Sequence, residues 1–104
     1  MRRVLWSDVQ AAARAVLAVD SPARAAFCGA LLRQAAAADR YTRRLKRDHP
    51  HWGNGTLLAA ARHYPLADER SFDDPDYCAC CLIVMGQIQQ HRQKILVSQA
   101  FTPT

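Results

Sequence analysis

The sequence lacks any long apolar segment, and this absence argues against a membrane protein. No apolar run approaches the roughly 18 residues that a membrane-spanning helix needs. The basic start, residues 1–3, is followed by only a short apolar stretch before Ser7 and Asp8, so no secretory signal is indicated. We therefore expect a soluble, cytoplasmic protein with no membrane partner, whose cysteines remain reduced thiols.

The sequence also lacks the short motifs of common enzyme classes. It has no nucleophile elbow, no glycine-rich phosphate loop and no paired-carboxylate signature. Three histidines, His49, His51 and His63, could form an acid–base site together with Asp48, but His-x-His in a loop is a common arrangement. We expect no catalysis and no cofactor, and a small enzyme using the His49/His51/His63 region is the last alternative.

Four cysteines are present, three of them close together in the last predicted helix. On a helix Cys78 and Cys81 share a face, whereas Cys80 points about 200° away from Cys78. Zinc takes roughly four ligands in structural sites, so this pair would need help from Cys28 or from histidines. Buried cysteine acting as a small apolar residue is more common. A metal- or redox-responsive module using Cys78 and Cys81 is therefore the second alternative.

Size and charge favour a small basic domain. The chain has 104 residues, half of them apolar, which fits one helical domain over residues 1–104 with a thin core. The net charge is +5, and twelve of the fourteen basic residues are arginine. Because the arginine fork suits phosphate and carboxylate groups, we expect a nucleic-acid partner or an acidic protein surface. The same charge could also serve solubility alone.

Helical periodicity governs the first half of the chain. Residues 7–10, S-D-V-Q, read as a capping box in which Ser7 caps the first helix. Its predicted buried face consists of Val9, Ala12, Ala13, Val16 and Leu17. Residues 21–22 suit the start of a second helix, which we expect to be the longest and to end at residues 49–50. Its smooth alanine segment, residues 35–38, leaves a homodimer open.

Two more helices are predicted in the second half. Thr56 suits the cap of a short helix, and Asp74-Pro75 starts a last helix that should run to about Val97. Its predicted buried stripe consists of Tyr77, Cys81, Val84, Met85 and Ile88. Residues 98–104 are expected to form a loose tail. The fold class is therefore all-α, a small bundle of about four helices with a long second helix and a central C-terminal helix.

The segment between the second and third helices carries the most specific local features. Basic residues gather at a helix end, and a turn follows in which residues 53–55 should include one with positive φ. The predicted binding residues are Arg40, Tyr41, Arg43, Arg44, Lys46, Arg47, His49, His51 and Trp52. They could contact phosphates and stack on a base, or meet an acidic protein surface. They could instead be solvated or pair with the acidic segment 68–76. For Trp52 we favour a place in the core.

Two motifs resemble a known pattern. Residues 49–57, H-P-H-W-G-N-G-T-L, and residues 74–77, D-P-D-Y, resemble small uncharacterised proteins of Rhodobacter-like alphaproteobacteria, which have H-P-x-W-G-[DN]-G-[ST]-L. The resemblance implies no activity and assigns no site residue. Function is therefore predicted from the residues themselves: a non-catalytic regulatory or adaptor module that binds nucleic acid or a nucleic-acid-handling protein.

Overall fold

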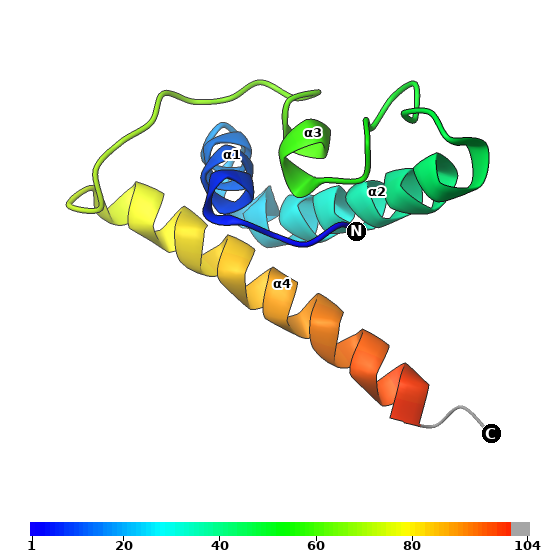
Figure 1. The fold of residues 1–104 in the computed structure, drawn as a ribbon. Coiled ribbons are helices and arrows are strands. Elements are labelled where there is room, and N and C mark those ends of the chain that lie inside the picture. Colours follow the sequence, from blue (N-terminus) through cyan, green and yellow to red (C-terminus); the bar gives the residue numbers. More distant parts are fainter. Residues whose placement is uncertain (101–104) are drawn as a thin grey trace.

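Four helices form the body of the protein. The computed structural model describes residues 1–100, with side chains for residues 1–95. The elements are α1 (Trp6–Leu17), a short 3-10 turn η1 (Ser21–Ala23), α2 (Arg24–Leu45), α3 (Leu57–Ala61) and α4 (Pro75–Ala100), as drawn in Figure 1. The described part of the chain contains no strand, so the all-α prediction is confirmed. None of these helices is long and apolar enough to cross a membrane.

The first helix begins earlier than predicted, because its N-cap position is Leu5 and not Ser7, and the Asp8 side chain reaches back to it. One carboxylate oxygen of Asp8 accepts the backbone N–H of Leu5 at 2.8 Å, and the helix begins at Trp6. The other oxygen accepts the backbone N–H of Leu58 in α3 at 2.9 Å. Asp8 is buried, and it therefore joins the start of α1 to the start of α3.

The second helix ends earlier than predicted. Lys46 takes the left-handed conformation, with φ of 58°, and its N–H donates to the Thr42 carbonyl at 2.9 Å, so α2 stops at Leu45. With 22 residues it is shorter than the 26-residue α4, which corrects the expected order of length. The last helix continues to Ala100 into the predicted tail, and residues 101–104 lie outside the described part.

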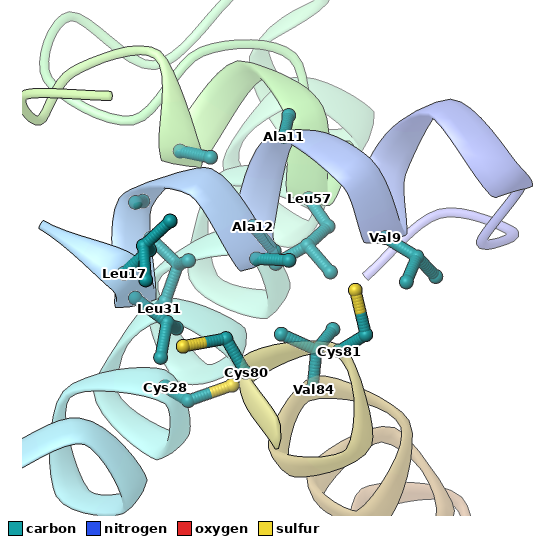
Figure 2. Packing of buried hydrophobic residues seen from close by; sticks show 14 of the residues in the cluster. Val9, Ala11, Ala12, Leu17, Cys28, Leu31, Leu57, Cys80, Cys81 and Val84 are labelled. Atoms are coloured by element: carbon teal, nitrogen blue, oxygen red, sulfur yellow. The ribbon is translucent and has the colours of Figure 1, made fainter. Parts of the chain in front are cut away.

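The core is built largely from small side chains around α1. Figure 2 shows Val9 and Ala12 of α1 facing Cys81 and Val84 of α4, with Leu57 of α3 nearby. All five residues of the predicted α1 face are buried. Small side chains let helices approach closely, but each buries little apolar area, so the few large buried residues carry much of the core's apolar burial.

The last helix buries one face and exposes another. Tyr77, Cys81 and Val84 are buried as predicted, whereas Met85 is 44% exposed, and Cys80 is buried in addition. The first half of α4 packs against α1 and α2, and its second half projects away from the bundle (Figure 1).

The alanine segment of α2 is covered within the chain. Ala35, Ala36 and Ala38 are all buried. A homodimer remains a prediction, but this segment does not offer a free surface for it.

Candidate functional site

The predicted binding residues lie at one end of the molecule, where α2 ends and the following loop folds back. The five arginine and lysine residues among them, hereafter the basic end, are all exposed: Arg40, Arg43, Arg44, Lys46 and Arg47. Arg43 pairs with the Asp39 carboxylate at 3.2 Å. The other four make no ion pair within the described residues, so their charge is not neutralised by a neighbouring carboxylate there.

A broad hollow of about 890 Å³ lies along the last turns of α2. It is lined by Ala37, Arg40, Tyr41, Arg43, Arg44 and Leu45. The side chains of Ala37 and Leu45 and the ring of Tyr41 are apolar, and three guanidinium groups border them. The hollow can therefore accept a flat or apolar group whose anionic substituents reach the arginines.

The aromatic residues of the site form a stack beside this hollow. The His49 ring lies 4.7 Å from the Trp52 ring with only 6° between their planes, and 4.8 Å from Tyr41 in an edge-on arrangement. His51 lies 5.9 Å from His49. Trp52 is partly exposed and does not belong to the core cluster, so the expected core position is wrong. Its ring is anchored by stacking on His49 instead.

Backbone hydrogen bonds fix this stack in place. His49 and Gly53 exchange two bonds, His49 N–H to the Gly53 carbonyl at 2.8 Å and the reverse at 3.1 Å. His49 Nδ1 accepts the N–H groups of His51 at 3.0 Å and Trp52 at 3.2 Å. Because Nδ1 accepts twice, it carries no proton in this arrangement. The loop is therefore a closed turn around the His49 ring.

Asp39 anchors the loop and the N-terminal segment to α2, a role that the sequence analysis missed. Gly55 has φ of 97°, and a Cβ there would lie 2.6 Å from Asp39 Cα, so only glycine allows this contact. The buried Asp39 carboxylate receives the Met1 amine at 3.2 Å. Burial lowers the pKa of that amine although Asp39 opposes the shift. The one signal in the sequence is that Asp39 is the single acid in a basic helix.

The acidic segment 68–76 does not neutralise the basic end. Its closest ion pairs join Asp76 to Arg24 at 2.7 Å and Asp74 to Arg70 at 2.9 Å. The hydrogen bond to Asp76 raises the pKa of Arg24. Figure 1 places the loop before α4 at the opposite end of the bundle from the end of α2. The basic end and the acidic segment therefore form no ion pair with each other.

The cysteines are packed as apolar residues. Cys81 is buried, whereas Cys78 is partly exposed, and Figure 2 shows Cys80 beside Cys28 of α2. Desolvation raises the pKa of Cys28 to about 12, and it also raises the pKa values of Cys80 and Cys81. These thiols are therefore protonated and poorly nucleophilic at neutral pH. The described residues contain no group of three or more His, Cys, Asp or Glu that could hold a metal ion.

The histidines of the third alternative are only partly brought together. His49, His63 and Asp48 line a second hollow of about 400 Å³ between the loop and α3, whereas His51 does not. His63 Nδ1 lies 2.8 Å from the Ala59 carbonyl, and His49 Nδ1 is occupied by backbone N–H groups. Within the described residues no hydrogen bond joins these groups to one another, so no acid–base pair is formed.

Comparison with known proteins gives a family and no activity. No curated protein and no solved structure matches the chain. A family model matches residues 2–88, a range that contains the whole predicted binding surface. The resemblance to proteins without an assigned activity agrees with this match. The chain therefore belongs to the family described as Domain of unknown function (DUF7742).

Proposed function

We propose that this chain is a small, non-catalytic regulatory or adaptor module that binds nucleic acid through the basic end and the loop that holds Trp52. The observation that carries the proposal is the set of four exposed basic residues without a carboxylate partner among the described residues, beside a hollow of about 890 Å³. Phosphate groups would supply the missing negative charge, and their binding would release counterions.

The shape of the surface favours nucleic acid over an acidic protein. Guanidinium groups of Arg40 and Arg44 border a surface formed partly by Tyr41, and the Trp52–His49 stack lies next to it. A nucleotide presents a charged phosphate next to a flat base, which matches guanidinium groups next to aromatic rings. A row of carboxylates on an acidic protein would pair with the guanidinium groups but would not use the aromatic rings.

The test is a titration of the protein with a short random-sequence DNA duplex at two salt concentrations. We expect micromolar binding that weakens steeply with salt. The Arg40→Glu, Arg44→Glu double variant should bind at least about tenfold more weakly, with a salt slope shallower by about 2, because two phosphate contacts are lost. Arg43 is left intact because its pairing with Asp39 would mix binding with stability.

The control variant is Arg3→Glu, Arg62→Glu, which changes the net charge equally. Arg3 and Arg62 are exposed, lie outside the basic end and take part in no ion pair within the described residues. This variant should bind far more tightly than the Arg40→Glu, Arg44→Glu variant. Equal losses in both would mean that net charge alone drives binding, which contradicts the proposed surface. No binding of wild type at low salt would remove nucleic acid as the ligand and leave an acidic protein, such as a nucleic-acid-handling protein, as the partner to seek.

A further inference from the structure

A small cavity lies between α2 and α4. The second half of α4 diverges from α2 (Figure 1). The volume of the cavity is about 150 Å³. Its lining includes Gly29 and Arg33 of α2 with Gln87, Gln90, His91 and Lys94 of α4. None of them belongs to the basic end.

The cavity is bordered by positive charge without a counterion. Arg33 and Lys94 are exposed and take part in no ion pair within the described residues. The sequence from residue 77 to the end contains no acid at all. The single acid of α2, Asp39, already holds the Met1 amine and Arg43. An anion in the cavity would therefore meet two cations that have no competing carboxylate nearby.

Gly29 keeps the floor of the cavity open. A Cβ at this position would lie 3.4 Å from Arg33 Nη1 and 3.4 Å from Gln87 Oε1. The guanidinium group and the amide thus both lie over the glycine, within reach of the same small ligand. The guanidinium donates N–H groups, which are the hydrogen bonds that an oxyanion accepts, and the Gln87 amide can donate to the same ligand when its NH₂ group faces the cavity in place of Oε1.

His91 adds a nitrogen whose hydrogen bonding is unsatisfied. Its Nε2 is buried and has no hydrogen-bond partner within the described residues. Burial lowers the pKa of His91, and the Met1 amine, Arg92 and Lys94 lower it further. Burial, and to a smaller extent the surrounding cations, therefore favour the neutral imidazole. An anion placed among them would reverse this balance, because it favours the protonated ring.

We propose that this cavity is a binding site for a phosphate group, with Arg33 and Lys94 supplying charge and Gln87, Gln90 and His91 supplying hydrogen bonds. The inference deepens the proposed function and rests on it for the source of the phosphate. A nucleic acid bound at the basic end would place a further backbone phosphate in this cavity. The middle and the end of α2 would then both contact the nucleic acid. Free inorganic phosphate has the same chemistry.

The first experiment is an NMR titration of the full chain with inorganic phosphate in a phosphate-free buffer, following the His91 ring protons. We expect saturable shifts at the cavity and a rise in the pH at which His91 titrates. The Arg33→Gln, Lys94→Gln variant should lose both effects, and Arg3→Gln, Arg62→Gln should keep them. No shift at tens of millimolar phosphate, or shifts that survive in the first variant, would overturn the proposal.

The second experiment identifies the source of the phosphate by titrating the same variants with the DNA duplex. A salt slope that becomes shallower by about 1 to 2 in Arg33→Gln, Lys94→Gln identifies a backbone phosphate. Unchanged duplex binding, together with loss of the phosphate shifts, identifies free phosphate as the ligand. If inorganic phosphate has no effect while Arg40→Glu, Arg44→Glu still abolishes duplex binding, the cavity proposal fails and the proposed function stands.

Discussion

At the scale of single residues, buried carboxylates decide how the segments of this chain meet. Asp8 is 4% exposed and satisfies two N–H groups that are 53 positions apart in sequence, at Leu5 and Leu58. Asp39 is equally buried, joins the N-terminal segment to α2 and pairs with Arg43 one turn further along the same helix. An unsatisfied buried N–H group is destabilising, so each of these carboxylates contributes more to the free energy of unfolding than one ordinary hydrogen bond does.

The role of Asp8 leads to the first stability prediction. Asp8→Ala should lower the free energy of unfolding by about 2–3 kcal/mol, because the backbone N–H groups of Leu5 before α1 and Leu58 in α3 both lose their acceptor. Urea unfolding followed by circular dichroism measures this loss. Ser7→Ala is the matched control and should change stability by less than about 0.5 kcal/mol, since Ser7 is exposed and makes no side-chain hydrogen bond within the described residues. A larger loss of stability in Ser7→Ala than in Asp8→Ala would show that Ser7 is the cap.

At the scale of elements, α4 has two apolar faces with different roles. Val84 is fully buried between α1 and α2, whereas Leu82, two positions away, is 65% exposed. The composition of the helix does not distinguish these faces, because both are apolar. Only the position of α4 against its neighbours decides which side chains are removed from water.

This difference predicts two very different alanine substitutions. Val84→Ala should lower the free energy of unfolding by about 2 kcal/mol, because it leaves a cavity in a core of small side chains. Leu82→Ala should change it by less than about 0.5 kcal/mol in the monomer. Denaturant unfolding at low protein concentration compares the two. A large effect of Leu82→Ala that appears only at high concentration would show that a second copy covers this face.

At the scale of the whole molecule, charge is divided between two ends. Residues 24–47 carry seven basic residues and one acid, and five of the nine acids lie between residues 68 and 76. The basic end and the acidic segment lie at opposite ends of the bundle (Figure 1). Such a charge distribution orients an approaching polyanion before contact, because the basic end attracts it and the acidic segment repels it.

Protonation should destabilise the whole molecule on the acidic side of neutrality. The pKa of His91 is lowered in the folded protein, whereas in the unfolded chain it returns to about 6.5. The unfolded chain therefore binds a proton first as the pH falls. Stability is complete above pH 6.5 and is lost as the pH decreases toward the lower folded pKa.

Unfolding measurements at pH 7.5 and 5.5 test this pH dependence. His91→Gln should reduce the loss of stability between the two values, because the variant has no proton to take up at this position. The control is His63→Gln, which removes an exposed imidazole and should leave the loss nearly unchanged. An equal loss in wild type and His91→Gln would show that other groups dominate.

The sequence by itself determined the features that local chemistry controls. Helical periodicity predicted four helices, and the hydroxyl of Thr56 caps α3 at 3.1 Å as expected. The glycines at 53 and 55 have the positive φ that their turn requires. The basic segment was also visible in the sequence, because neighbouring residues on a helix end stay neighbours in the fold.

Tertiary structure alone decided the contacts between distant residues. Asp8 reaches a helix 50 positions later, and Arg33 and Lys94 line the same cavity from two different helices. Each of these depends on the relative placement of whole helices. A local pattern specifies which face of a helix is apolar, but the energy of packing that face against others is shared by many residues far apart in the chain.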